Sequence, residues 1–137
     1  IGMKTVLMNR NPERASKLGE DLRSMGFEAE DRPLADFRAC FRESDIIIYN
    51  IPAPIPELTA LTKEDFAPGK AKFILEANYR NPSFDEVLLA GMREANPSAQ
   101  YTSGRTWLLN QALTGYEIFT GEKPDTIKMA EVISGSR

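Results

Sequence analysis

Short apolar runs alternate with helix-start signals along the chain, and this alternation constrains the fold more than any other feature. The clearest run is DIIIYN, residues 45–50, a continuous β-branched stretch typical of a parallel strand covered on both faces. Residues 3–8 and 71–77 are further strand candidates, and residues 27–31 and 99–102 are weaker ones. Strands that alternate with helices predict an α/β sheet with right-handed crossovers.

Capping residues mark where the helices begin and end. Asn11 followed by Pro12 is a good start signal, and Gly26 suits the end of the same helix. Ser103 and Gly121 bracket a longer helix in the same way. The other helices are expected over residues 34–42, over residues 85–95 and from residue 124 onward.

The composition indicates one soluble domain. Of the 137 residues, 42% are hydrophobic and 27% are charged, which is enough for a core and unlike a disordered chain. A net charge of −3 argues against a nucleic-acid-binding protein, and no apolar stretch approaches the length of a membrane span. We therefore expect a cytoplasmic protein whose partners include neither nucleic acid nor membrane.

Histidine is absent and cysteine occurs once. Without histidine, a zinc site or a histidine-based catalytic triad is not expected, and no metal is predicted. Cys40 lies between Ala39 and Phe41, which predicts a buried structural thiol. A single free cysteine also suits a reducing compartment.

Ligands of open parallel sheets bind at the carboxyl ends of the strands, which draws attention first to Asn9 and Arg10. Arginine at such a strand end suits the 2′-phosphate of NADP, whereas an acid there suits NAD. Arg14 follows in the first turn of the next helix, whose N-terminus also favours an anion. The alternative interpretation is an ordinary strand end with solvated arginines.

Two later strand ends carry rigid or polar residues. Alternate prolines from Pro52 to Pro56 predict a stiff extended loop, which either borders a cofactor or is a surface connection. At the end of the next strand, Tyr79 either contacts a polyol substrate through its hydroxyl or is structural, while Glu76 is suited to anchoring a loop.

Gly104, Trp107 and Gln111 fall at i, i+3 and i+7, on one face of the longest predicted helix. Glycine permits close backbone approach, tryptophan offers a flat apolar wall, and the glutamine amide both donates and accepts hydrogen bonds. This face either lines a pocket for a planar ring beside hydroxyl groups or packs in the core.

Four ordered segments resemble motifs of the shikimate dehydrogenase family. The family's N-R-T-x-x-R-A run corresponds to NRNPERA, and its D-I-(V/I)-(I/V)-N strand with a Thr/Ser/Pro-rich loop corresponds to SDIIIYNIPAP. Its D-x-x-Y near a proline corresponds to EANYRNP, and its G-x-x-M-L-x-x-Q-A run, with an aromatic residue and T-G further on, corresponds to GRTWLLNQALTGYEIFTGEKP. Each motif is weak alone, but the ordered set covers nearly the whole chain and is specific.

The resemblance implies a Rossmann-like, mostly parallel sheet flanked by helices and an NADP-dependent oxidoreductase that converts 3-dehydroshikimate to shikimate in aromatic amino-acid biosynthesis. The substrate would be a small cyclic polyol. The cofactor-binding residues implied in this way are Asn9, Arg10, Arg14, Asn50, Ile51, Pro52, Gly104 and Trp107, and the substrate-binding residues are Tyr79 and Gln111.

Several positions depart from the family's pattern and indicate a divergent member. Asn11 replaces threonine, Glu76 replaces aspartate and Trp107 replaces methionine, while the loop after DIIIYN lacks the usual hydroxyl side chains. Because these changes fall near the implied site, the residues do not distinguish shikimate, quinate and related substrates.

The family's usual first strand, its glycine-rich turn and its catalytic lysine and aspartate have no counterpart in this sequence, so no catalytic residue is assigned. We therefore expect residues 1–137 to be a C-terminal nucleotide-binding fragment, inactive alone, in which residues 103–137 pack toward a missing N-terminal substrate domain. The usual first strand is central, so either a companion polypeptide completes the sheet, or the strands close up or exchange between chains of a homo-oligomer.

Two other functions stay open on the residues alone. One is a non-catalytic dinucleotide-binding regulatory module of the same fold, and the other is a plain interaction domain with solvated arginines. A nucleotide that raises the melting temperature of the protein would argue against the interaction domain.

Overall fold

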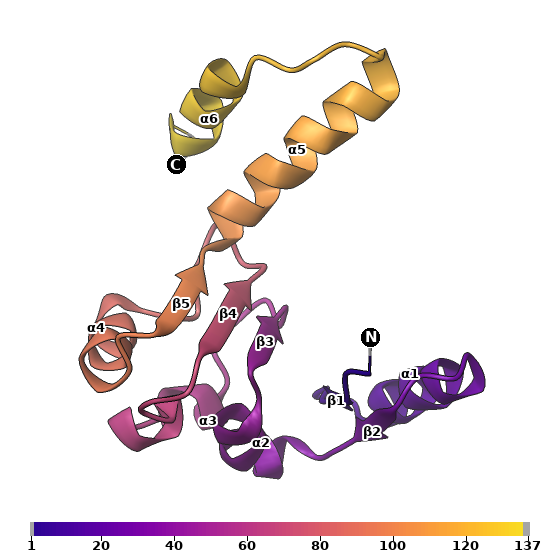
Figure 1. Ribbon diagram of the computed structural model, residues 1–137, viewed down its shortest axis with the longest axis vertical. Coiled ribbons are helices and arrows are strands. Elements are labelled where there is room, and N and C mark those ends of the chain that lie inside the picture. The colour runs from indigo at the N-terminus through magenta and orange to yellow at the C-terminus, as the bar shows by residue number, and fades with distance from the viewer. Residues whose placement is uncertain (1, 136–137) are drawn as a thin grey trace.

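The computed structural model describes residues 2–135, in which strands and helices alternate as predicted (Figure 1). The strands are β1 (Thr5–Leu7), β2 (Ala29–Asp31), β3 (Ile46–Tyr49), β4 (Lys72–Glu76) and β5 (Ala99–Thr102). The α-helices are α1 (Pro12–Ser24), α2 (Phe37–Glu43), α3 (Pro56–Thr59), α4 (Glu86–Ala95), α5 (Gly104–Thr120) and α6 (Thr126–Gly135), and the 3₁₀ helices are η1 (Leu34–Asp36) and η2 (Lys63–Phe66).

The strands are parallel but form two sheets. β1 pairs with β2, and β3, β4 and β5 pair in that order. Within residues 2–135 no pairing joins β1 to β3, so the expected sheet is divided (Figure 1). The alternative in which the strands close up is therefore wrong for the described chain.

The limits of α1 follow from its capping residues. The Asn11 side chain accepts a hydrogen bond from the backbone N–H of Glu13 at 2.9 Å, and Pro12 occupies the first helical position. Gly26 follows the helix with a φ of 85°, a left-handed conformation that glycine adopts without strain. The predicted start and stop of this helix are confirmed.

One face of the three-stranded sheet forms the core with α2, α3, η2 and α4. Side chains alternate along the strands, so Tyr49, Ile74 and Tyr101 lie on this face, and Phe84 packs edge-on to Tyr49 with ring centroids 5.7 Å apart. Cys40 is only 7% exposed, which confirms the predicted buried thiol, and burial raises its pKa. The other buried members of the core cluster are Phe37, Phe41, Ile55, Leu58, Leu61, Phe66, Leu89 and Met92.

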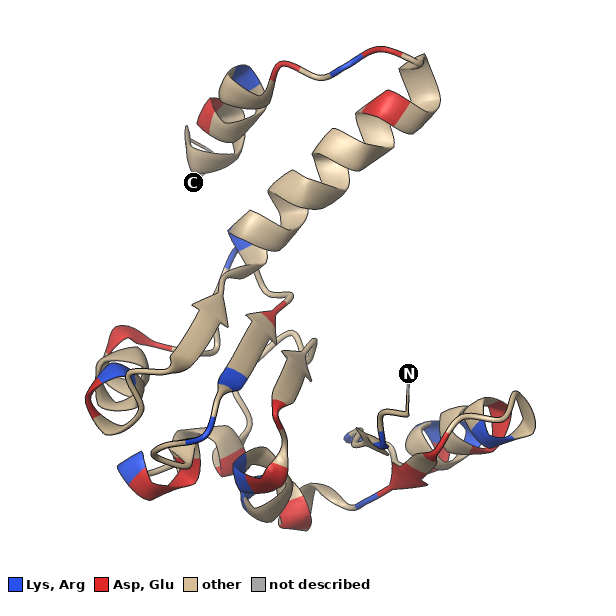
Figure 2. Ribbon diagram, in the orientation of Figure 1, with Lys and Arg blue, Asp and Glu red and all other residues tan. Residues whose placement is uncertain are grey.

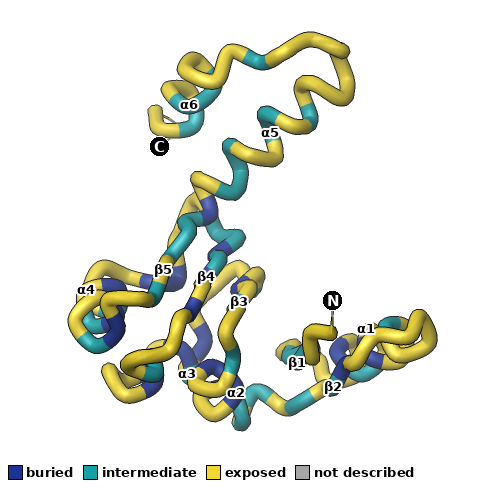
Figure 3. The backbone as a smooth tube through the Cα atoms, in the orientation of Figure 1, coloured by how far each residue is buried: buried dark blue, intermediate teal, exposed yellow. Residues whose placement is uncertain are grey.

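The opposite face of this sheet is open. Ile46 and Ile48 of β3 are 55% and 66% exposed, and Phe73, which pairs with Ile46, is 45% exposed. Figure 3 shows exposed segments on β3 beside buried ones on the neighbouring strand. The prediction that the DIIIYN strand is covered on both faces is therefore wrong for the described chain, because helices cover one face only.

Helices α5 and α6 form an arm that projects from the sheet. Ser103 caps α5 by accepting a hydrogen bond from the Thr106 N–H, and Gly121 ends it with a φ of 71°. α6 packs beside α5, and most of the arm is exposed (Figures 1 and 3). No helix within residues 2–135 has the length and apolar character needed to cross a bilayer.

The prolines after β3 act differently from one another. Pro52 and Pro54 lie in an extended loop, as predicted, but Pro56 begins α3. Proline suits the first position of a helix, where its missing N–H has no helical partner. The predicted extended loop is therefore wrong at its last residue.

Candidate functional site

Some of the residues singled out from the sequence lie just after the carboxyl ends of the strands, and the others, Arg14, Trp107 and Gln111, lie on α1 and α5. Asn9 and Arg10 follow β1, Asn50 follows β3, the segment from Ala77 follows β4, and Ser103 follows β5. Because β3, β4 and β5 are parallel and in register, their following loops lie at one edge of the sheet. This is the edge at which parallel α/β sheets bind ligands.

The turn after β1 is held by two asparagines. The Asn9 Oδ1 accepts a hydrogen bond from the Asn11 N–H at 2.9 Å, and Asn11 in turn caps α1. Arg10 therefore lies in a tight turn that leads directly into the N-terminus of α1. The helix dipole places partial positive charge at the same point.

Arg10 and Arg14 present two exposed guanidinium groups at this turn. Within residues 2–135 neither side chain forms an ion pair or a hydrogen bond, whereas Arg38 and Arg42 both bind the buried Asp65 carboxylate at 2.8 Å. Figure 2 shows mixed charges along α1 and few on α5. The two unpaired cations beside a helix N-terminus are available to bind an anion.

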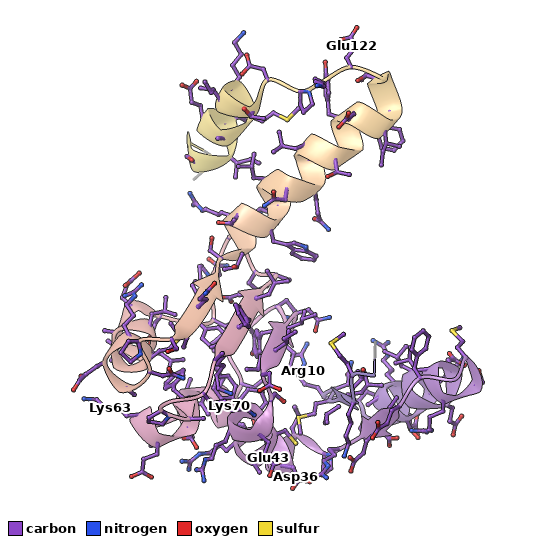
Figure 4. The ribbon with its side chains drawn as sticks, viewed as in Figure 1. Arg10, Asp36, Glu43, Lys63, Lys70 and Glu122 are labelled. Atoms are coloured by element: carbon purple, nitrogen blue, oxygen red, sulfur yellow. The ribbon has the colours of Figure 1, made fainter. Side chains whose placement is uncertain are left out.

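Arg10 also lies near the end of β3. In Figure 4 its side chain lies between the two sheets. Burial raises the pKa of the Tyr49 phenol, and the positive charge of Arg10 opposes that shift. The carboxyl ends of β1 and β3 therefore lie at the same end of the molecule.

The proline-containing loop after β3 is anchored at two points. The Tyr49 hydroxyl donates to the Ala53 carbonyl at 2.6 Å, and the Asn78 Nδ2 donates to the Ile51 carbonyl at 2.6 Å. Asn50 and Pro52 lie on this loop and are exposed. The structure therefore holds the loop rigidly against the loop that follows β4.

Glu76 anchors the loop after β4, which confirms that interpretation of the residue. Its buried carboxylate accepts hydrogen bonds from the Ser83 N–H at 2.5 Å, the Phe84 N–H at 3.4 Å and the Tyr101 hydroxyl at 2.6 Å. Burial, followed by the hydrogen bond to Glu76, raises the pKa of Tyr101 above its ordinary value. The carboxylate thus joins β4, β5 and the intervening loop.

Gly104 is the point at which α5 meets that loop. It is buried, and a Cβ at this position would lie 2.3 Å from the Asn78 carbonyl oxygen and 2.7 Å from the Tyr79 nitrogen. The predicted close backbone approach is confirmed, and the backbone that approaches belongs to the chain itself. Only glycine lets α5 begin directly on this loop.

The contact at Gly104 places the start of α5 beside Tyr79, and Trp107 and Gln111 follow along that helix. Tyr79 is 37% exposed, and the Arg80 guanidinium lies over its ring, 5.5 Å from the centroid. Trp107 is half-buried and Gln111 is exposed on α5, so their helix face does not pack in the core of the described chain. A flat apolar ring, a phenol and an amide are thus available to a ligand.

Sequence reasoning missed the residues that position this site. Asn78 bridges two loops through its contacts with Ile51 and Ser83, and Tyr101 contacts Glu76 from a neighbouring strand. No local signal marks these contacts, because each partner lies at least five residues away in sequence. Within residues 2–135 no three His, Cys, Asp or Glu side chains are grouped to hold a metal ion.

Comparison with known proteins places the fold. A quinate dehydrogenase from Corynebacterium glutamicum, in complex with NAD, matches with a TM-score of 0.70 at 19% identity over 97% of this chain and 46% of its own. A shikimate dehydrogenase in complex with NADP+ matches with a TM-score of 0.69 at 20% identity over 96% of this chain and 46% of its own. Shikimate 5-dehydrogenase from Thermus thermophilus, in complex with NADP(H) and shikimate, matches with a TM-score of 0.64 at 20% identity over 97% of this chain and 46% of its own.

These likenesses are structural. No protein-family model and no curated protein matches the sequence. The chain spans about half the length of the solved structures that it matches. The described chain therefore has the Rossmann-like fold of a portion of the shikimate and quinate dehydrogenases, which confirms the resemblance at the level of the fold.

Proposed function

We propose that this chain is the nucleotide-binding part of an NADP-dependent dehydrogenase that acts on a small cyclic polyol of the shikimate type. The observation that carries the proposal is the pair of unpaired guanidinium groups, Arg10 and Arg14, at the carboxyl end of β1 and the start of α1. In dinucleotide-binding sheets, an acid at such a strand end binds the ribose of NAD, and arginine accommodates the 2′-phosphate of NADP. Here the strand is followed by a neutral asparagine and an arginine.

The donors present fit a phosphate monoester. A guanidinium offers a planar fork of N–H donors that matches phosphate oxygens, and two of them share this turn with a helix N-terminus. Asn9 holds the turn through its bond to the Asn11 N–H. We assign Asn9, Arg10 and Arg14 to the 2′-phosphate end, and the rigid loop of Asn50, Ile51 and Pro52 to the edge of the cofactor.

The proposed substrate-binding residues are positioned by the contact between the start of α5 and the loop after β4. Gly104 brings the helix onto the Asn78–Tyr79 backbone, which places Trp107 and Gln111 on the helix that begins beside Tyr79. We propose that the Tyr79 hydroxyl and the Gln111 amide bind the hydroxyl groups of the polyol, with Gly104 and Trp107 beside the nicotinamide. The cofactor, when bound, supplies the hydride, and these residues orient the two reactants.

The remaining parts of the enzyme are also proposals. The matched dehydrogenases are about twice as long as this chain. We propose that a lysine and an aspartate of a substrate domain carry the proton transfer, that residues 103–137 pack toward that domain, and that residues 1–137 alone are inactive. The buried free thiol of Cys40 agrees with a reducing, cytoplasmic location.

The cofactor assignment is tested with 2′,5′-ADP, which carries the 2′-phosphate, against ADP, which lacks it. We expect the chain to bind 2′,5′-ADP more tightly in a calorimetric titration. Arg10→Ala should weaken that binding by about tenfold, since a hydrogen bond to a charged group contributes about 1.5 kcal/mol, and should leave ADP binding unchanged.

Arg93→Ala is the matched control, because Arg93 is an exposed arginine on α4 that forms an ion pair with Glu86 at 3.7 Å, away from the strand ends. It should bind both nucleotides as the wild type does. Equal affinity of the wild-type chain for 2′,5′-ADP and ADP, or an unchanged preference in Arg10→Ala, would contradict the assignment.

A further inference from the structure

Arg80 places a cation beside Tyr79 on the loop that follows β4. Its guanidinium carbon lies 5.5 Å from the centroid of the Tyr79 ring, and both side chains are exposed. Within residues 2–135 Arg80 forms no hydrogen bond or ion pair, so this ring contact is its one polar interaction there. A cation–π contact at an exposed position is weak, and it leaves the N–H donors of the guanidinium available.

Most arginines of the described chain pair with carboxylates of the fold. These pairs are Arg23 with Asp31, Arg32 with Glu30, Arg38 and Arg42 with Asp65, and Arg93 with Glu86. Within residues 2–135 Arg10, Arg14 and Arg80 have no such partner, and Arg10 and Arg80 each follow the carboxyl end of a parallel strand. That edge binds ligands in α/β sheets, so an unpaired cation there is available to an anion from outside the chain.

The carboxylates of the same loop are engaged elsewhere. The Asp85 Oδ1 accepts a hydrogen bond from the Leu88 N–H at 2.8 Å, and Glu86 pairs with Arg93 at 3.7 Å. The Glu76 carboxylate is buried and accepts from backbone N–H groups and the Tyr101 hydroxyl. Within the described residues, no acid of this loop neutralises the charge of Arg80.

The backbone that carries Arg80 is held on both sides. Before it, Asn78 donates to the Ile51 carbonyl at 2.6 Å, and the backbone of Asn78 and Tyr79 packs against Gly104. After it, Ser83 is held through its N–H by Glu76 and through its Oγ by Asn78. Only residues 79–82 lie between these anchors. A short loop fixed at both ends loses little backbone entropy when a ligand binds.

Arg80 and Arg10 lie at different points along the edge of the fold. Arg10 follows β1 and Arg80 follows β4, and Figure 1 shows β3 between these two strands. In the proposed function Arg10 binds the 2′-phosphate of the cofactor. Arg80 adjoins Tyr79, which is proposed to bind the polyol, so the second cation lies beside the substrate.

We propose that Arg80 is a specificity-determining residue, which binds a carboxylate on the ring of the polyol and selects the acid over its neutral counterpart. The planar fork of guanidinium donors matches the two oxygens of a carboxylate, while the Tyr79 hydroxyl binds a ring hydroxyl group. This inference rests on the proposed polyol site at Tyr79 and adds to it the charge of the ligand and the residue that reads that charge.

The test is an NMR titration that follows the Nε–H group of Arg80, whose signal is assigned by its loss in Arg80→Gln. The two probes are shikimate, which carries a ring carboxylate, and its methyl ester, which keeps the ring hydroxyls without the charge. We expect saturable shifts of the Arg80 Nε–H and the Tyr79 amide with the acid. The ester should bind at least about tenfold more weakly, because it lacks the hydrogen bond between two charged groups.

Substitutions separate charge recognition from a structural role. Arg80→Gln should bind the acid and the ester with equal affinity, whereas Arg80→Lys, which keeps the charge without the fork, should keep part of the preference. Arg93→Gln is the matched control and should keep the full preference, because Arg93 pairs with Glu86 on α4. A purely structural role would weaken both ligands together, so the ratio of the two affinities is the readout.

Several results would overturn the proposal. These are equal wild-type affinities for the acid and the ester, an unchanged ratio in Arg80→Gln, or no saturable shift with the acid. Inorganic pyrophosphate that shifts the Arg80 signal at lower concentration than the acid does would assign this cation to the diphosphate of a cofactor instead.

The comparison of 2′,5′-ADP with ADP keeps the two proposals distinguishable. A preference for 2′,5′-ADP in a chain that does not distinguish the acid from the ester would leave the cofactor assignment standing and remove the role of Arg80. The reverse pair of results would support Arg80 as a carboxylate-binding residue and remove the assignment of Arg10 to the 2′-phosphate.

Discussion

Gly104→Ala should destabilise the protein, because the first residue of α5 has no room for a side chain. The added Cβ would lie 2.3 Å from the Asn78 carbonyl oxygen, 2.4 Å from its carbonyl carbon and 2.7 Å from the Tyr79 nitrogen. Non-bonded carbon atoms normally lie at least about 3.5 Å from their neighbours, so the helix and the loop must separate by about 1 Å. All three obstructing atoms are backbone atoms, which cannot rotate away as a side chain can.

The magnitude follows from what that separation disturbs. Inserting a methyl group into a closely packed contact costs about 1–3 kcal/mol. The same shift strains the Asn78 side chain, which donates to the Ile51 carbonyl at 2.6 Å and contacts the Ser83 Oγ at 3.0 Å, for about 1 kcal/mol more. The higher helix propensity of alanine offsets up to about 1 kcal/mol of this cost. With the full offset, we expect a net loss of about 1–3 kcal/mol, and the central value of about 2 kcal/mol corresponds to roughly 8 °C in Tm.

Urea unfolding followed by circular dichroism measures this loss. Gly115→Ala is the matched control, since Gly115 lies in the same helix and a Cβ there has no atom within 4 Å. That substitution should stabilise the protein by about 0.5–1 kcal/mol. If Gly104→Ala were as stable as the wild type, or as strongly stabilised as Gly115→Ala, the close contact of Gly104 with the Asn78–Tyr79 backbone would be refuted.

The remaining predictions concern charged groups. Burial raises the pKa of Asp65, but the Thr62 N–H and the guanidinium groups of Arg42 and Arg38 lower it to about 2. The Asp65 carboxylate therefore contributes about 2 kcal/mol to the free energy of unfolding above pH 3.8, its ordinary pKa, and this contribution is lost as the pH falls toward about 2. Asp65→Asn should remove this loss, so that the free energy of unfolding, measured with urea at each pH, changes less between those two values. Glu76→Ala should cost about 3 kcal/mol and speed amide exchange at Ser83, because two buried backbone N–H groups and the part-buried Tyr101 hydroxyl lose their acceptor. Unchanged exchange would contradict the anchoring role. Binding of 2′,5′-ADP should weaken as salt rises from about 0.05 to 0.5 M, and salt-independent calorimetric affinities would argue against an arginine site.

The positions of the helices and strands could be predicted because their signals are local. Asn11, Gly26, Ser103 and Gly121 act on backbone groups within a few residues of themselves, and each one caps or follows a helix as predicted. Cys40 was predictable for a similar reason, since its apolar neighbours mark a buried helix face.

The candidate site was predictable in part. Parallel strands bring their carboxyl ends to one edge, so Asn9, Arg10 and Tyr79 were found from the strand pattern alone. The pairing of Asn78 with Ile51 and of Tyr101 with Glu76 was not, because these contacts join residues 25 or more apart. The roles of the site residues toward cofactor and substrate stay predictions.

The sequence by itself determined which segments become strands and helices, where the helices begin and end, and which side chains follow each strand, because propensity, capping and alternation act over short distances. Only the tertiary structure decided that β1 and β3 stand apart, that Ile46 and Ile48 are exposed, and that Gly104 seats α5 on the Asn78 backbone. Those outcomes depend on which distant segments pair and which face each helix covers. A β-branched run is the same in a buried strand and in an open one, and the difference lies in the partners that the fold brings to it.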